Sequence, residues 1–220
     1  MSDNMKERVI VCFGDSNTHG YDAKANGRYP HSVRWTGRLQ QLLGDKFLVR
    51  EAGMSGRTTV FEDPLFEGLN GFSAIYPTLM THAPVELLVV MLGTNDSKAR
   101  FAVTPDNIAK GMCRLIEKAM MCKEAWQGKP KVLLIAPPPI RPEYAMSRVA
   151  GEMGAGCAEK SKALGALYKE LAAKLDIAFW DAAELGADVM NDLDFMHLTA
   201  EAHAALADVV AAKVRELCPE

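Results

Sequence analysis

Short apolar runs alternate along this chain with longer segments in which apolar residues recur at helical spacing. The short runs are typical of buried parallel strands, and they lie at Val9–Phe13, Phe47–Val49, Leu87–Leu92, Val132–Ala136 and Ile177–Trp180. The segments with helical periodicity are Arg34–Leu43, Phe72–Thr81, Pro105–Lys123, Glu159–Leu175 and Ala200–Leu217. This alternation predicts one α/β domain over residues 1–220, with a five-stranded, doubly wound parallel sheet between two helical layers.

Two stretches interrupt the alternation and predict long loops. Tyr21–Val33 contains Gly27 and Pro30, and Pro137–Gly156 begins with three prolines and is rich in Gly and Met. Loops of this length in a compact domain are usually functional. Both follow predicted strands, so we expect them to form walls of a pocket at the carboxyl edge of the sheet.

Charge and composition narrow the class of protein. The chain has 220 residues and a formal net charge of −3, so charge gives no support for binding nucleic acid or an anionic membrane surface. The polar segment 1–8 lacks the apolar core of a signal peptide, and no apolar run is long enough to span a bilayer. The five cysteines are scattered and form no C-x-x-C pair. We therefore expect a cytoplasmic protein with reduced thiols.

Small and polar residues gather after the first three predicted strands and again before the last helix. They form the segments Gly14–Asn17, Gly53–Thr58, Gly93–Asp96 and Asp192–His197. Ligands of open parallel sheets bind at the carboxyl ends of the strands. If the sheet is doubly wound, these four segments converge on one site there.

Together, the four segments supply the groups that acyl transfer needs. Ser16 is the candidate nucleophile, because a serine hydroxyl can attack a carbonyl once a base takes its proton. His197 is the candidate base, and Asp194 can orient its imidazole. The backbone amides of Ser16 and Gly56 and the side chain of Asn95 are the candidate oxyanion donors. Gly53 is an alternative to Gly56.

These segments, in this order, resemble the sequence blocks of the SGNH or GDSL hydrolases from about residue 8 to residue 216. Three stretches look most like the arylesterase and acyltransferase branch of the family: Arg34–Gly37, Gly56–Thr59 and Met91–Lys98. The resemblance implies a flavodoxin-like α/β/α fold, hydrolysis of small acyl esters and a homo-oligomer. It also maps the catalytic roles to Ser16, Asp194 and His197, and the oxyanion donors to Gly56 and Asn95. It implies no cofactor and no metal. If the site excludes water, an alcohol can replace water in deacylation, and the reaction is then acyl transfer.

Other residues near these blocks have more than one interpretation. Asn17 stands where the family name has leucine, and we expect it to adjust the turn. Asp15, Trp35, Lys98 and Met196 are substrate-pocket candidates, although Asp15 is also a typical turn residue and Trp35 a typical packing residue. His203 has no comparable context, and we expect it on the solvent side of the last helix.

Three rival functions remain open at this point. Asp15, Asn95, Asp96, Asp194 and His197 could be imagined as metal ligands of a phosphoesterase, although no H-x-H, H-x-x-x-H or D-x-H pair is present. A nucleotide-binding module is less favoured, because Gly14–Gly20 lacks the P-loop lysine and carries Asp15. A scaffold of the same fold that binds a ligand without turnover is the third, since fold does not establish function.

Overall fold

A computed structural model describes residues 8–219, except for the side chain of Ala187. At its centre lies a parallel sheet of β1 (Arg8–Gly14), β4 (Phe47–Gly53), β5 (Val85–Met91), β6 (Val132–Ala136) and β7 (Ala178–Asp181). The strand order is β4-β1-β5-β6-β7, which is the flavodoxin-like order 2-1-3-4-5. From β1 the chain first adds β4 on one side and then adds β5, β6 and β7 on the other. Such folds bind ligands at the carboxyl ends of the strands where the strand order reverses.

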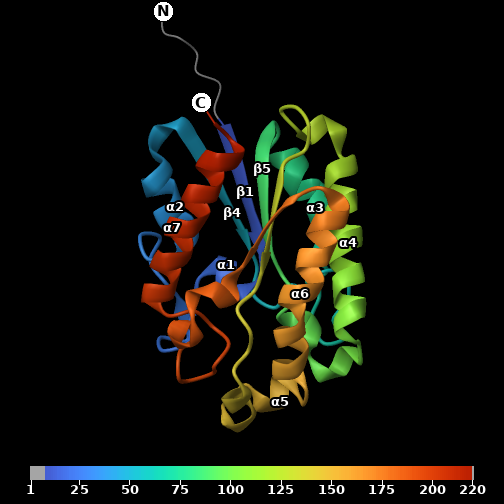
Figure 1. Ribbon diagram of the computed structural model, residues 1–220. Helices are drawn as coiled ribbons and strands as arrows, with labels where there is room; N and C mark the ends of the chain where they lie inside the picture. Colours follow the sequence, from blue (N-terminus) through green and yellow to red (C-terminus); the bar gives the residue numbers. More distant parts are fainter. Residues whose placement is uncertain (1–7, 220) are drawn as a thin grey trace, which may run out of the picture.

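Helices cover both faces of this sheet, as Figure 1 shows. α2 (Trp35–Leu43) and α7 (Ala200–Leu217) cover one face, and α3 (Gly71–Thr81), α4 (Pro105–Met121) and α6 (Cys157–Leu175) cover the other. The two short helices are α1 (Ser16–His19) and α5 (Ala150–Met153). The 3₁₀ turns are η1 (Gly44–Lys46), η2 (Asn95–Ser97), η3 (Ala99–Phe101), η4 (Lys123–Ala125), η5 (Pro142–Met146), η6 (Ala182–Leu185) and η7 (Ala187–Val189). The predicted three-layer α/β fold is confirmed.

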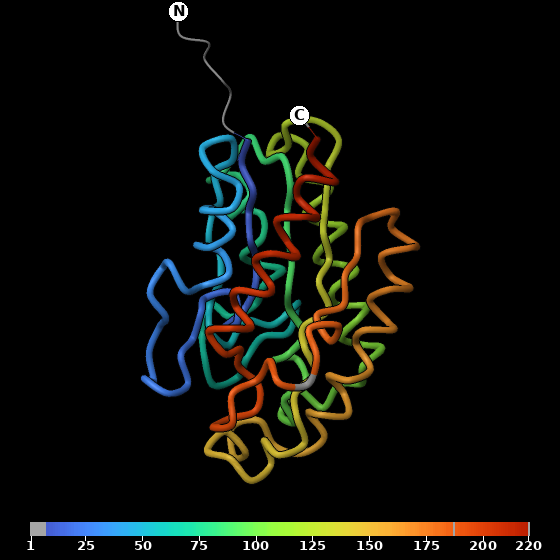
Figure 2. Tube along the Cα trace, turned by 60° about the vertical axis from the view of Figure 1, so that its left-hand side comes forward, coloured from blue at the N-terminus to red at the C-terminus, as the bar shows by residue number. Residues whose placement is uncertain are grey.

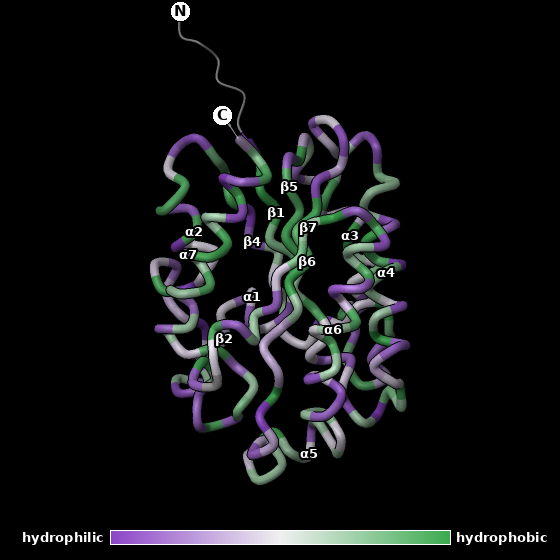
Figure 3. Tube along the Cα trace, in the orientation of Figure 1, coloured by the Kyte–Doolittle hydropathy of each residue, from purple (hydrophilic) through white to green (hydrophobic). Residues whose placement is uncertain are grey.

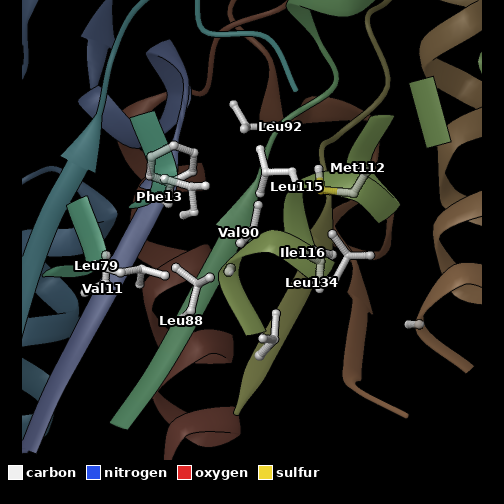
Figure 4. Packing of buried hydrophobic residues seen from close by; sticks show 14 of the residues in the cluster. Val11, Phe13, Leu79, Leu88, Val90, Leu92, Met112, Leu115, Ile116 and Leu134 are labelled. Atoms are coloured by element: carbon white, nitrogen blue, oxygen red, sulfur yellow. The ribbon is translucent and has the colours of Figure 1, made fainter. Parts of the chain in front are cut away.

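Alternating side chains of the strands enter two separate cores. Val11 and Phe13 pack with α3 and α4 residues such as Leu79 and Leu115 (Figure 4), whereas Ile10 and Cys12 face α2 and α7. Figure 3 shows that hydrophobic residues concentrate in the central strands. Because strands buried on both faces read as continuous apolar runs, the sequence locates them well. No helix in residues 8–219 is both long and apolar enough to pass through a lipid bilayer.

The sequence predicts a second strand of Phe47–Val49, which is shorter than the strand in the structure. β4 continues to Gly53 and pairs with β1 up to Gly14. The charged residues that end the apolar run are accommodated at this sheet edge, because Glu51 accepts hydrogen bonds from Arg34 at 2.7 and 2.9 Å. The strand therefore runs far enough to bring its terminal turn beside that of β1.

The two predicted loops carry short elements of their own. Tyr21–Val33 contains a small hairpin of β2 (Tyr21–Asp22) and β3 (Gly27–Arg28), while Pro137–Gly156 contains η5 and α5. Figure 2 shows both segments at the end of the molecule where the carboxyl ends of the strands lie. The expectation that the polar segment 1–8 lacks a signal peptide concerns residues that lie outside the described part of the chain up to position 7.

The placement predicted for His203 is wrong. Its side chain is fully buried between α7 and α2, and its Nδ1 atom accepts a hydrogen bond from the backbone N–H of Trp35 at 3.3 Å. Burial lowers the pKa of His203 to about 4, and the charges of His197 and Arg34 act in the same direction. The neutral imidazole thus serves as a packing residue and acceptor, a role that helical spacing alone does not reveal.

Candidate active site

Ser16 lies at the tight junction between β1 and α1. Asp15 caps α1 by accepting a hydrogen bond from the backbone N–H of Asn17 at 2.9 Å, so Ser16 becomes the first residue of the helix. Gly20 ends the helix in the left-handed conformation, with φ 82°. Ser16 is only 4% exposed. The turn therefore fixes its hydroxyl at the carboxyl edge of the sheet.

His197 and Asp194 reach this hydroxyl from the loop before α7. The Nε2 atom of His197 lies 2.8 Å from Ser16 Oγ, and its Nδ1 atom lies 2.9 Å from Asp194 Oδ2. All three groups are buried. The structure thus brings the three predicted residues into one continuous chain of hydrogen bonds, in which the imidazole can accept the serine proton while Asp194 fixes its tautomer.

Asp194 is held in its ionised form by several donors. Its Oδ1 atom accepts hydrogen bonds from Asn191 Nδ2 at 2.9 Å and from the backbone N–H groups of Met196 and His197 at 3.1 Å each. Burial opposes ionisation, but the bond and charge of His197, together with these donors, lower the pKa of Asp194 to about 2. Asp194 is therefore a carboxylate at neutral pH. Asn191 is a supporting residue that the sequence analysis did not single out.

The predicted oxyanion donors also meet at this edge. Gly56 and Asn95 line the same cavity as Ser16 and His197. Gly56 has φ 86°, a conformation that glycine adopts without strain, and Asn95 Nδ2 donates one hydrogen bond to Arg57 O at 3.2 Å. A second amide hydrogen of Asn95 remains for a ligand. Gly53 instead packs against α1, where an added Cβ would lie 2.2 Å from His19 N.

Buried charged side chains fix the turns that carry the site residues. Asp96 accepts hydrogen bonds from the backbone N–H and the hydroxyl of Thr59, which ties the third sequence block to the second. Desolvation raises the pKa of Asp96, and likewise that of Asp15, to about 6. Arg57 stacks over the Phe13 ring, 4.3 Å from its centroid, and bonds the backbone oxygen of Gly14 at 3.0 Å. These contacts fix the loops that carry Ser16, Gly56 and Asn95.

A cavity of about 430 Å³ opens directly over Ser16 and His197. Its lining comprises Ser16, Tyr21, Ser55, Gly56, Phe66, Glu67, Leu69, Asn95, Lys98, Val149, Glu152, Met153, Met196 and His197. Lys98 and Met196 are therefore placed as predicted. Asp15 and Trp35 do not line the cavity, so their prediction as pocket residues is wrong: Asp15 turns inward to cap α1, and Trp35 packs in the core between α2 and the sheet.

Both predicted loops form walls of the cavity, as expected, but the sequence does not specify which of their residues line it. Tyr21 lies against His197, with 4.6 Å between ring centroids, and its hydroxyl donates to Asn26 Oδ1 at 2.7 Å. Arg148 from the opposite loop donates to the Tyr21 hydroxyl at 3.3 Å and to Ala23 O at 2.6 Å. The aromatic residue directly after Gly20 was the only available signal for this wall, since the contacts depend on the tertiary fold.

Lys98 belongs to an ion-pair network at the rim of the cavity. Its Nζ atom lies 3.1 Å from Glu152 Oε1 and 4.0 Å from Asp63 Oδ2, and Arg100 pairs with the same two carboxylates. Two cations thus face two anions. This network ties α5 to the segment that follows Asn95, so it fixes the distal wall of the cavity. Within residues 8–219, no group of three or more His, Cys, Asp or Glu side chains is arranged to hold a metal ion.

The sequence matches the model of the GDSL-like lipase/acylhydrolase family over residues 12–205. This match spans most of the chain, and the chain belongs to that family. Together with the relatives described next, it identifies a carboxylic ester hydrolase, so the family resemblance seen in the sequence is confirmed. The comparison with curated proteins gives no match.

Solved structures extend the comparison. Est24, a carbohydrate acetylesterase from Sinorhizobium meliloti, is 38% identical with a TM-score of 0.87, covering 96% of this chain and 100% of its own. The aryl esterase of M. smegmatis is 36% identical with a TM-score of 0.84, covering 96% of this chain and 99% of its own. A lipase/acylhydrolase from Enterococcus faecalis, at 19% identity and a TM-score of 0.70, shares the fold.

Proposed function

We propose that the protein is a serine esterase that cleaves small acyl esters through an acyl-enzyme formed on Ser16. The observation that carries this proposal is the unbroken chain from Ser16 Oγ through His197 to Asp194, with contacts of 2.8 and 2.9 Å, at the floor of a cavity. A hydroxyl with a base in direct contact, and a carboxylate behind that base, is the arrangement that activates serine for attack on a carbonyl.

In the first half-reaction, Ser16 Oγ forms a bond to the ester carbonyl carbon while its proton passes to His197 Nε2. The carbonyl oxygen takes up the negative charge, and the amides of Ser16 and Gly56 and the Asn95 side chain donate hydrogen bonds to it. The tetrahedral intermediate then collapses, the bond from carbon to the alcohol oxygen breaks, and His197 returns its proton to the departing alcohol.

In the second half-reaction, water attacks the acyl-serine while His197 accepts one of its protons. Collapse releases the carboxylic acid and returns the proton to Ser16 Oγ, which restores the free enzyme. An alcohol bound in place of water would instead yield a new ester. The apolar walls of the cavity, including Leu69, Val149 and Met153, favour an organic acceptor over water and support acyl transfer.

The cavity supports a compact, uncharged substrate. Its walls are largely apolar, and Lys98 is already paired with carboxylates, so it offers no free cation to an acidic substrate. A volume of about 430 Å³ accommodates an acetyl-type group together with an aryl or other small alcohol. The names of the two relatives, an aryl esterase and a carbohydrate acetylesterase, are consistent with acetyl-type esters of a phenol or a sugar.

The proposal is tested with Ser16→Ala and Asp194→Asn on p-nitrophenyl acetate and a panel of longer acyl esters. We expect Ser16→Ala to abolish turnover with the fold intact by circular dichroism, and Asp194→Asn to lower kcat by about 10⁴-fold. The matched control is Asp192→Asn, whose exposed carboxylate lies two residues away and 3.4 Å from Arg141. Substantial turnover by Ser16→Ala would refute the proposal.

The same panel separates this proposal from a metal-dependent phosphoesterase. The wild-type enzyme is assayed on acyl esters and on p-nitrophenyl phosphate, each with and without a chelator. We expect chelation to leave acyl-ester hydrolysis unchanged and a serine-directed phosphonate to abolish it. Loss of activity with the chelator, together with insensitivity to the phosphonate, would favour the rival mechanism.

A further inference from the structure

The residue after Ser16 departs from the leucine of the family name, and its side chain does not face the cavity. Asn17 is 2% exposed and points toward the loop that carries His197. Its Nδ2 atom donates a hydrogen bond to Met196 O at 3.1 Å, and its Oδ1 atom accepts one from Leu198 N at 3.0 Å. One amide side chain thus joins α1 to the loop before α7, although its two partners lie 179 and 181 positions away in the sequence.

These two partners belong to the peptide groups on either side of His197. Met196 O is part of the peptide before the histidine, and Leu198 N is part of the peptide after it. The amide of Asn17 meets a carbonyl with its NH₂ group and an N–H with its oxygen, so only one orientation of the amide satisfies both partners. Asn17 therefore holds the backbone of His197 in one register relative to the helix that carries Ser16.

The loop has a second anchor that acts in a different way. Asn191 Nδ2 donates to Asp194 Oδ1 at 2.9 Å and to His197 O at 2.8 Å, and Asn191 Oδ1 accepts from the backbone N–H groups of Leu193 and Asp194. These bonds all lie within residues 191–197, so they keep the loop folded. They do not connect the loop to α1. Asn17 makes that connection, and it sits directly beside Ser16.

We propose that Asn17 is a positioning residue that sets the distance between His197 Nε2 and Ser16 Oγ; this inference rests on the proposed function of these two groups. Leucine has a similar size but no hydrogen-bonding atoms, so Asn17→Leu would leave Met196 O and Leu198 N buried without their partner. The loop would keep its internal bonds and shift relative to α1. A misplacement of the order of 1 Å between reacting groups lowers the rate by about 10²-fold.

The test is a double-mutant cycle on p-nitrophenyl acetate between Asn17→Leu and His197→Ala, assayed where melting curves show every variant folded. We expect Asn17→Leu alone to lower kcat by about 10- to 100-fold with KM unchanged, and to slow phosphonate labelling of Ser16 in proportion. In the His197→Ala background, Asn17→Leu should cause no further loss, because residues that act as one unit are not additive.

Thr18→Val is the matched control, because Thr18 is the next residue of α1, is fully buried, and its hydroxyl bonds no partner. We expect it to keep the wild-type kcat. Asn17→Asp is the second variant should Asn17→Leu fail to fold: it keeps the acceptor for Leu198 N, loses the donor to Met196 O, and should lower kcat as well.

Two results would overturn the inference: wild-type kcat in both folded Asn17 variants, or an equal fold-loss from Asn17→Leu in the wild-type and His197→Ala backgrounds. Full activity of His197→Ala would instead refute the proposed function itself, so the two failures are distinguishable.

Discussion

The imidazole of His197 and the hydroxyl of Ser16 are in direct contact, with 2.8 Å between Nε2 and Oγ, although 181 positions separate the two residues in the chain. The contact exists because β1 ends beside the loop before α7 at one edge of the sheet. Tyr21 packs on one side of the imidazole, and Asp194 bonds its Nδ1 atom.

Replacement of Asn95 by alanine tests the oxyanion site. The variant loses a side-chain donor at the cavity, and we expect kcat to fall by about 10²- to 10³-fold with little change in KM, because the donor acts on charge that develops only in the transition state. Steady-state kinetics on p-nitrophenyl acetate measure this effect. Asn107→Ala, on the exposed first turn of α4, is the control and should retain full activity. An unchanged kcat in Asn95→Ala would remove Asn95 from the oxyanion site.

Tyr21 offers a test of the wall contributed by the first loop. Tyr21→Phe keeps the ring against His197 and loses only the bonds to Asn26 and Arg148, so its kcat should stay near wild type. Tyr21→Ala removes the ring and exposes the imidazole to water, and we expect a loss of about tenfold in kcat/KM, the order of one aromatic contact. Equal kinetics for the alanine and phenylalanine variants would show that the ring contact has no role.

The residues that form the site could be predicted because they lie in short blocks after the strands or before the last helix. Each block follows an apolar run whose position is plain, and parallel strands bring their carboxyl ends to one edge. Ser16, Gly56, Asn95, Asp194 and His197 are therefore found from spacing and family resemblance.

The walls of the cavity could not be predicted in the same way. Tyr21, Phe66 and Val149 reach the cavity from irregular segments whose paths depend on contacts such as those of Arg148 and Glu152. Trp35 has two interpretations in the sequence, a pocket residue and a packing residue, and only the helical register in the structure places it in the core. The buried position of His203 likewise depends on the packing of α2 against α7.

The buried Asp96 predicts a pH dependence of stability. Burial raises its folded-state pKa from 3.8 to about 6, so between these values the folded protein binds more protons than the unfolded chain. The contribution of Asp96 to stability therefore falls as pH rises from about 4 to 6, by an amount of the order of 3 kcal/mol. Asp194, with its pKa lowered to about 2, and His203, with its pKa lowered to about 4, contribute in the opposite direction, so the effect of Asp96 must be measured against a variant that lacks its charge.

The measurement is urea unfolding of wild type and Asp96→Asn at pH 4.5 and 7.0. The amide oxygen of the variant still accepts from Thr59 N and carries no charge, so from pH 4.5 to pH 7.0 its free energy of unfolding should fall less, or rise more, than that of the wild type. An equal change in the two proteins, or a greater loss of stability with rising pH in Asp96→Asn than in the wild type, would contradict the raised pKa. Asp106→Asn, in the first turn of α4, is the control for a general charge effect.

Assembly is a separate prediction, which follows from the family resemblance and the two long loops. We expect light scattering at micromolar concentration to give a mass that is a multiple of the 24.0 kDa chain. A single species of monomer mass across the concentration range would refute the predicted homo-oligomer.

Trapping the acyl-enzyme tests the central claim most directly. The enzyme is mixed with excess p-nitrophenyl acetate, quenched in acid within the first turnover, digested and analysed by mass spectrometry. We predict the mass of one added acetyl group on the peptide that contains Ser16, with no such peptide from Ser16→Ala. An acetyl group on another residue that forms and decays at the rate of turnover, or turnover in Ser16→Ala equal to wild type, would contradict the assignment of Ser16 as the nucleophile.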